Sequence, residues 1–226
     1  MRVFIFFLAL LTVPPAPARS AEESTCYGSY DQGSLEHAQQ LPKSGANFNA
    51  YSALGVLLGR NFVHSKVAEV VVRSYAALEK SAPGKRFIYG ETGNKHGGKS
   101  RPHKSHQNGL SVDFFVPVVN AKKESVALPT SVLNKFGYNI EFDGDARYKE
   151  FHIDFEALAQ HIEAIKTEAD KLGVGIRVVI FDNEFQKILF ATPAGKLLEP
   201  KVKFSTKKPW VRHDEHYHID FVVPCK

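Results

Sequence analysis

Hydrophobic residues recur every three or four positions in two stretches of the chain. In the first stretch, residues 65–80, they are Val67, Val70, Val71, Tyr75 and Leu78. This spacing places them on one stripe of a helix. Pro83 and Gly84 follow and cannot continue the helix. The pattern therefore predicts a helix that buries one face.

The second stretch covers residues 155–172. Its apolar positions are Leu158, Ala159, Ile162, Ile165 and Ala169. Asp154 stands where an N-cap side chain accepts a backbone N–H, and Gly173 is typical of the residue just after a helix. We expect a second helix between these two residues.

Short runs of apolar and aromatic residues lie between and after the helices. They predict strands at residues 86–89, 110–118, 176–181 and 216–223. Strands mixed with flanking helices favour an α+β domain built on a small antiparallel sheet. The chain has 226 residues, 43% of them hydrophobic, which suits one such domain with a substantial core.

Two of these strands alternate between apolar and polar positions. Their apolar faces consist of Leu110, Val112, Phe114 and Val116 in one strand and of Tyr217, Ile219, Phe221 and Val223 in the other. The opposite faces carry Asp113 in the first strand and His216, His218 and Asp220 in the second. Each strand can therefore pack on a core while its other face presents polar side chains to a cleft.

The first residues have the layout of a secretory signal. Arg2 precedes an apolar run over residues 3–13, and small residues and prolines follow. We expect residues 1–18 to be a signal peptide, with cleavage after Ala21 as the alternative, and residues 22–226 to form the functional domain. The apolar run is shorter than the roughly 20 residues that span a bilayer. We expect no membrane span in the mature protein.

The net charge of +5 and the two cysteines add less specific information. Basic and acidic residues are interspersed, so the charge fits an anionic partner without choosing between cell-wall peptides and nucleic acid. Export of the chain argues against nucleic acid.

An oxidising compartment would allow Cys26 and Cys225 to form a disulfide that joins the two ends of the domain. Two free thiols are the alternative.

The histidines cluster in two places that a metal ion would bring together. His96, His103 and His106 lie in a polar stretch over residues 90–108, which we expect to be a functional loop. His213, His216 and His218 lie near the last strand. Either group alone is typical of solvent-exposed side chains. Together with Asp113 they supply two histidines and one carboxylate, the open ligand set of a catalytic zinc site.

The spacing of these residues resembles that of the penicillin-insensitive murein endopeptidases. The segments are HKSHQNGLSVD, residues 103–113, and PWVRHDEHYHIDF, residues 209–221. The wider group of zinc peptidases, which includes lysostaphin-type enzymes, D-Ala-D-Ala carboxypeptidases and hedgehog domains, has a histidine, an aspartate seven residues later and a later His-x-His. The narrower family adds a histidine three positions before each motif, and this chain has both. The HExxH motif of commoner metalloproteases is absent from the sequence.

The resemblance implies a role for each residue that matches the motif. His106, Asp113 and His218 would be the Zn²⁺ ligands, and His216 the unliganded catalytic histidine. His103 and His213 would be further residues of the catalytic cleft. The family also has an acidic residue that matters for activity, for which Asp154 is the candidate, although a helix cap explains Asp154 equally well.

The implied activity is hydrolysis of peptide cross-links in peptidoglycan, in the periplasm, between D-alanine and the side-chain amine of a diamino acid. A hedgehog-like or D-Ala-D-Ala-peptidase-like α+β fold is implied with it. Two alternatives use the same metal site: a D,D-carboxypeptidase that trims stem peptides, and a non-catalytic wall-binding module. The accessory histidines His103, His213 and His216 argue against the binding module.

Overall fold

The computed structural model describes residues 22–101, 103–207 and 211–226. The expected signal peptide and its cleavage site lie outside the described residues. The fold is α+β, as the sequence predicts. In the part of the chain that the structure describes, no helix is long and apolar enough to cross a membrane.

A five-stranded sheet forms the centre of the molecule. Its strands are, in spatial order, β12 (Gly175–Ile180), β13 (His216–Val222), β7 (Ser111–Phe115), β6 (Phe87–Tyr89) and β4 (Phe48–Ala50). Neighbouring strands among the first four are antiparallel, and the last strand, β4, is parallel to β6. The predicted strands at residues 86–89, 176–181 and 216–223 are confirmed as β6, β12 and β13.

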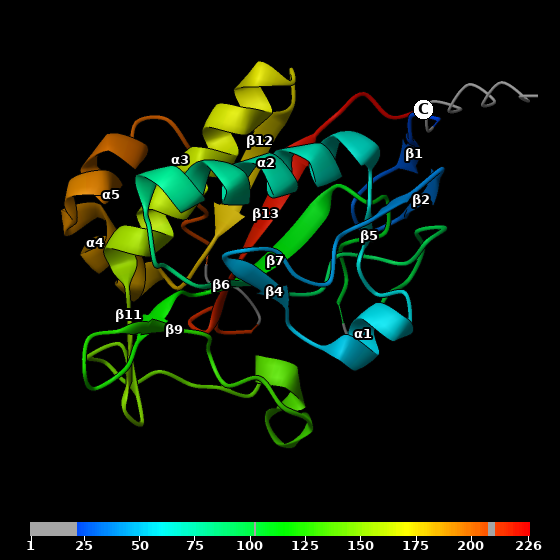
Figure 1. Cartoon of the computed structure of the whole chain (residues 1–226). Coiled ribbons are helices and arrows are strands. Elements are labelled where there is room, and N and C mark those ends of the chain that lie inside the picture. Colours follow the sequence, from blue (N-terminus) through cyan, green and yellow to red (C-terminus); the bar gives the residue numbers. More distant parts are fainter. Residues whose placement is uncertain (1–21, 102, 208–210) are drawn as a thin grey trace, which may run out of the picture.

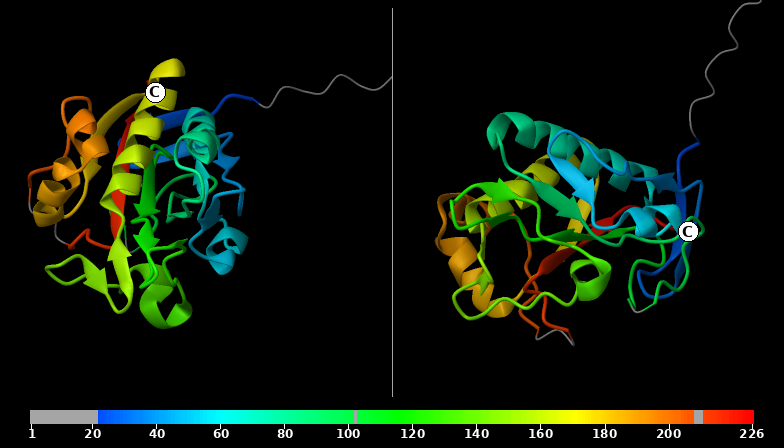
Figure 2. Two further views of the ribbon diagram at one scale, coloured as in Figure 1. Left: turned by 60° about the vertical axis from the view of Figure 1, so that its left-hand side comes forward. Right: turned by 60° about the horizontal axis from the view of Figure 1, so that its bottom comes forward.

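Two long helices cover one face of this sheet, side by side (Figure 1, Figure 2). They are α2 (Ser65–Ser81) and α3 (Phe155–Lys171), and both predicted helices are confirmed within one or two residues. The Asp154 side chain caps α3 by accepting the N–H of Ala157 at 3.0 Å. Because their apolar stripes face the sheet and each other, the helices bury Val70, Tyr75 and Ile162 completely.

The apolar alternation of β7 and β13 points toward these helices, as predicted. Phe114 of β7 and Tyr217 of β13 are fully buried and stack with ring centroids 5.4 Å apart. His161 of α3 lies against both: its ring centroid is 5.0 Å from that of Phe114, and its Nδ1 shares a hydrogen bond with the Tyr217 hydroxyl. The even-numbered residues of β7 therefore belong to the helix side, and Asp113 to the other side.

Two further helices and a second sheet extend the domain at one end (Figure 1). Helices α4 (Asn183–Ala191) and α5 (Pro193–Leu198) contact α3. A second sheet contains β10 (Arg147–Tyr148), β11 (Phe151–Ile153), β8 (Val118–Val119) and β9 (Ser125–Val126). The strand predicted at residues 110–118 is thus two strands, since Pro117 has no N–H to continue the ladder.

Shorter elements complete the domain around the central sheet. They are β1 (Thr25–Gly28), β2 (Gly33–Glu36), β3 (Gln39–Gln40), α1 (Ala53–Leu57), β5 (Phe62–Val63) and the 3₁₀ segment η1 (Val132–Gly137). The expected disulfide is present, with Cys26 of β1 bonded to Cys225. Lys226 N–H also donates to the Cys26 carbonyl at 2.9 Å. These contacts hold the segment after β13 against the first hairpin.

Candidate metal centre

The register of β7 against β13 places the polar residues of both strands together. Asp113 is directly opposite His218, and Phe115 is opposite His216. Side chains of paired residues point to the same face of a sheet, so His218 and Asp113 meet on the face away from α2 and α3. Both are buried, with Asp113 completely inaccessible.

Asp113 is the residue on which the other side chains converge. Its Oδ1 lies 2.8 Å from His218 Nδ1 and 3.3 Å from His106 Nε2. Its Oδ2 accepts the Tyr138 hydroxyl at 3.0 Å and lies 3.7 Å from His103 Nδ1. Ligands of a tetrahedral zinc ion, bound at about 2.0–2.1 Å, are roughly 3.3 Å apart. The separation of His106 Nε2 and Asp113 Oδ1 matches this value, whereas His218 Nδ1 lies at hydrogen-bond distance from Asp113.

The loop before β7 brings His103 and His106 to this carboxylate. Ligand atoms of His103, His106 and Asp113 all lie within 4.8 Å of one another. His106 has a left-handed backbone with φ 71°, and its Nδ1 lies 3.2 Å from the Ser111 carbonyl, so Nε2 faces Asp113. The predicted loop over residues 90–108 contains no helix or strand among its described residues, but its ends are buried.

His216 lies beside this group on the same face of β13. Its ring is 5.1 Å from the Tyr138 ring and 4.6 Å from the His213 ring, measured between centroids. Its Nδ1 lies 2.8 Å from Oε1 of the buried Glu215. Glu215 thus holds one ring nitrogen of His216. Trp210, in the second matching segment, lies outside the described residues.

The electrostatics of these histidines follow from burial and from their carboxylate neighbours. Burial lowers the pKa of His216 to about 4. Burial also acts to lower the pKa of His218, but Asp220 and Asp113 outweigh it and raise this pKa to about 10. Burial works against the ionised form of Asp113, yet its histidine neighbours, His106 first and including the hydrogen bond from His218, hold its pKa well below the usual range. At neutral pH the cluster therefore contains a carboxylate and a neutral His216.

Glu91 is a site residue that sequence reasoning missed. Its Oε2 lies 2.9 Å from His103 Nε2 and accepts from the Arg60 guanidinium at 2.7 Å, and its Oε1 accepts the Tyr51 hydroxyl at 3.1 Å. Glu91 lies two residues after the end of β6, behind Gly90, and is 8% exposed. A charged residue just beyond an apolar strand was the signal in the sequence. Its partner Arg60 is 31 residues away, which no local pattern reveals.

Asp154 lies elsewhere, at the N-terminus of α3. One carboxylate oxygen caps the helix, and the other accepts the Lys85 ammonium at 2.6 Å. Neither contact involves the histidine cluster. Of the seven side chains named in the sequence as site candidates, the structure thus groups six, with His213 in contact through His216.

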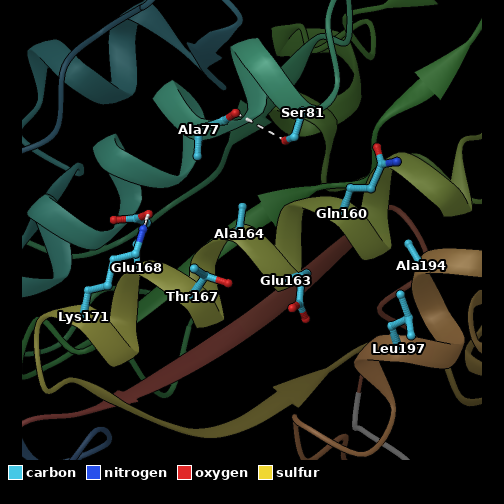
Figure 3. A pocket seen from close by; sticks show the side chains of 10 residues that line it. All are labelled: Ala77, Ser81, Gln160, Glu163, Ala164, Thr167, Glu168, Lys171, Ala194 and Leu197. Atoms are coloured by element: carbon cyan, nitrogen blue, oxygen red, sulfur yellow. Dashed lines mark hydrogen bonds and ion pairs between the residues drawn. The ribbon is translucent and has the colours of Figure 1, made fainter.

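Of two cavities among the described residues, one lies away from the histidine cluster and one is connected to it through Tyr51. One of about 350 Å³ lies between α2, α3 and α5 on the helix side, lined by residues such as Gln160 and Thr167 (Figure 3). None of its lining residues belongs to the histidine cluster. The other, of about 610 Å³, lies between α1 and η1 and is lined in part by Tyr51 and Phe136. Since Tyr51 also binds Glu91, this second cavity shares a wall with the cluster.

Several imidazoles and a buried carboxylate on one face of a sheet make a donor set suited to a transition metal. An α+β domain with this cluster and a neutral histidine beside it defines a candidate metal-dependent hydrolase. The chain belongs to the penicillin-insensitive murein endopeptidase family, whose model matches residues 26–226. The match covers the whole described domain except its first residues, and the family is one of metallopeptidases. No curated protein matches the chain.

Proposed function

We propose that this protein is a zinc metallo-endopeptidase that hydrolyses D-alanyl-diamino acid cross-links of peptidoglycan in the periplasm. The observation that carries the proposal is the convergence of His106 and His218 on the buried Asp113. Family membership supports the peptidase activity and the murein substrate. The signal-like residues 1–18 support export of a domain formed by residues 22–226.

His106, Asp113 and His218 would hold the metal. His103, which also lies against Asp113, would stand next to them with its second nitrogen bound to Glu91. When bound, zinc acts as a Lewis acid and lowers the pKa of a bound water to about 7. The His218 proton must leave when this residue becomes a ligand, so metal binding would weaken as the pH is lowered.

The chain's own residues then carry the proton transfers. His216 is neutral at pH 7 and is held at Nδ1 by Glu215, so its Nε2 is available to accept a proton from the attacking water and to donate it to the leaving amine. Tyr138 donates to Asp113 and keeps the carboxylate oriented. His213, in ring contact with His216, would help to shape the substrate side of the site.

The cavity beside Tyr51 favours an endopeptidase over a carboxypeptidase. A cross-linked dimer needs room for a peptide stem on both sides of the scissile bond, whereas a carboxypeptidase needs room on one side only. The cavity of about 610 Å³ between α1 and η1 offers such space, and Tyr51 of its lining binds Glu91, the partner of His103. Lys43 lines it and can pair with a stem carboxylate.

The decisive experiment is digestion of purified cross-linked peptidoglycan with and without a chelator, followed by separation of the muropeptides by chromatography and mass. We expect dimers to become monomers only when metal is available. Loss of terminal D-alanine from single stems, with dimers intact, would replace the proposal by the carboxypeptidase. Unchanged muropeptides with metal present would favour the wall-binding module.

A variant of His216 separates chemistry from metal binding. His216→Ala should lower turnover by about 10²–10⁴-fold, the usual contribution of a general acid–base, and leave the zinc content near that of the parent. Zinc content is measured by atomic emission on the same preparations. Loss of the metal in this variant would make His216 a ligand instead.

A further inference from the structure

Asp220 is a buried carboxylate on the same face of β13 as His216 and His218, but outside the expected ligand set. It is 2% exposed and is opposite Ser111 in the register of β13 and β7. Its Oδ1 lies 2.8 Å from His218 Nε2 and accepts the Ser111 hydroxyl at 2.6 Å. Its Oδ2 is bound by the guanidinium of Arg177. Both oxygens of this buried carboxylate are therefore bound.

These contacts fix the orientation of His218. Nε2 of the imidazole contacts Asp220 and Nδ1 contacts Asp113, so the ring lies between two carboxylates. Asp113 belongs to the converging ligand atoms, whereas Asp220 lies behind the ring. Asp220 therefore holds Nε2 of His218, and Nδ1 faces Asp113 and the site.

A second layer of contacts holds Asp220 in place. The Arg177 guanidinium, on the neighbouring strand β12, lies 4.5 Å from the centroid of the Tyr30 ring. Tyr30 donates its hydroxyl to the Phe221 carbonyl at 2.6 Å, and its own carbonyl accepts the N–H of Gln107 at 2.9 Å. The segment after β1 thus contacts both the residue after Asp220 and the residue after His106.

Ser111 connects the same layer to a second expected ligand. Its hydroxyl donates to Asp220, and its carbonyl lies 3.2 Å from Nδ1 of His106. One residue of β7 therefore takes part in orienting both His106 and His218. Carboxylates and carbonyls on the far nitrogen of a metal-binding histidine fix its tautomer and raise its basicity as a ligand.

We propose that Asp220, held by Ser111 and Arg177, is a positioning residue that sets the metal affinity of the site by fixing His218. This inference rests on the metal centre of the proposed function. Asp220 does not touch the reacting atoms; it acts through the imidazole. Losing its charge should weaken metal binding about 10–100-fold, the usual effect of removing such a partner.

The test compares Zn²⁺ affinities of the parent and of Asp220→Asn, measured on metal-stripped protein by competition with a chromophoric chelator. Asp170→Asn is the matched control, because Asp170 is also an aspartate in an ion pair but lies on the exposed side of α3. Ser111→Ala, which removes the hydroxyl and keeps the carbonyl toward His106, should weaken binding in the same direction but less. The absorption spectrum of Co²⁺-loaded protein reports on the ligand geometry independently of activity.

Weaker binding in Asp220→Asn, with an altered Co²⁺ spectrum and an unchanged fold by circular dichroism, supports the inference. Affinity within twofold of the parent overturns it while leaving the proposed function intact. If Asp220→Asn does not fold, Ser111→Ala decides, and an unchanged affinity there overturns the inference. A parent protein that binds no Zn²⁺ overturns the inference and the proposed metal centre together.

Discussion

Two buried histidines on opposite faces of β13 have opposite electrostatics. His161, on the helix side, touches Tyr217, and burial lowers its pKa to about 3. His218, on the site side, is also buried, yet Asp220 and Asp113 overcome the effect of burial and raise its pKa to about 10. The helix side surrounds its histidine with Tyr75, Phe87 and Phe114 instead.

The comparison shows that burial alone does not make a histidine functional. Desolvation disfavours the charged form on both faces, and only neighbouring carboxylates can reverse it. His161 therefore remains a neutral part of the core with one hydrogen bond, and its Nε2 has no hydrogen-bond partner among the described residues. A buried imidazole between two carboxylates is equipped to bind a cation, whether a proton or a metal ion.

Removing the carboxylate at the centre of the site should have the largest effect. Asp113→Asn keeps the shape of the side chain but takes away the charge that faces His106 and His218. We expect loss of bound zinc and of nearly all turnover, measured by metal content and by muropeptide release. The His161→Phe, Tyr217→Phe double variant, altered on the other face, is the control and should keep its metal. Parent-like zinc content in Asp113→Asn would refute the role of Asp113 as a ligand.

Breaking the disulfide should affect both faces, because β13 contributes to each. The Cys26–Cys225 bond closes a loop with a sequence separation of 199 residues. In the chain-entropy model, a loop of this length stabilises the folded protein by about 5 kcal/mol. Cys26→Ala with Cys225→Ala should lower the free energy of unfolding by a comparable amount and weaken zinc retention. Equal urea midpoints with and without reductant would contradict this expectation.

His161, on the helix side, should make the folded protein less stable in acid. An unfolded histidine titrates near about 6.5, and the folded pKa of His161 is about 3. Between these values only the unfolded chain binds the proton, so stability falls as the pH is lowered, by about 1.4 kcal/mol per pH unit from this residue.

The double variant His161→Phe with Tyr217→Phe should have a shallower loss of stability between pH 6 and 4. It replaces both hydrogen-bonding partners by apolar rings, so neither is left unpaired, and the aromatic packing is kept. The measurement is the free energy of unfolding in urea at several pH values. A slope equal to that of the parent would mean that His161 is not neutral in the folded protein.

A substitution of Asp154 should have the smallest effect, and it tests whether this residue is a helix cap or an active-site acid. As a cap bound to Ala157 and Lys85, it should tolerate Asn, which caps helices about as well. We expect Asp154→Asn to lose less than about 1 kcal/mol of stability and to keep its turnover. A 100-fold loss of turnover in a stable variant would instead show that Asp154 is the acidic residue implied by the family resemblance.

Elements with a repeating pattern could be predicted from the sequence, and short ones could not. The helices α2 and α3 follow the spacing of their apolar residues, and β13 follows strict alternation. The two-residue strands such as β3, β5 and β8 are too short to show a period. Helices α4 and α5 were also missed.

Those site residues that belong to short local motifs could be predicted from the sequence, and those that the fold brings in from elsewhere could not. The two histidine motifs and Asp113 are visible because each occupies a few positions of a loop or strand. Glu91 and Tyr138 reach Asp113 or His103 from other parts of the chain. Asp220 was visible as a third polar residue of the strand, but its contact with the far side of His218 depends on how β7, β12 and β13 are aligned.

The position of β13 in the sheet also fixes when the site can exist. This strand is inserted between β7 and β12, both of which precede it in the sequence. Until residues 216–222 are in place, the edges of β7 and β12 that β13 fills have no partner strand. Pairing of β13 closes the sheet and places His216 and His218 in one step. A chain that lacks this last strand therefore lacks both histidines and the sheet that positions Asp113 against them.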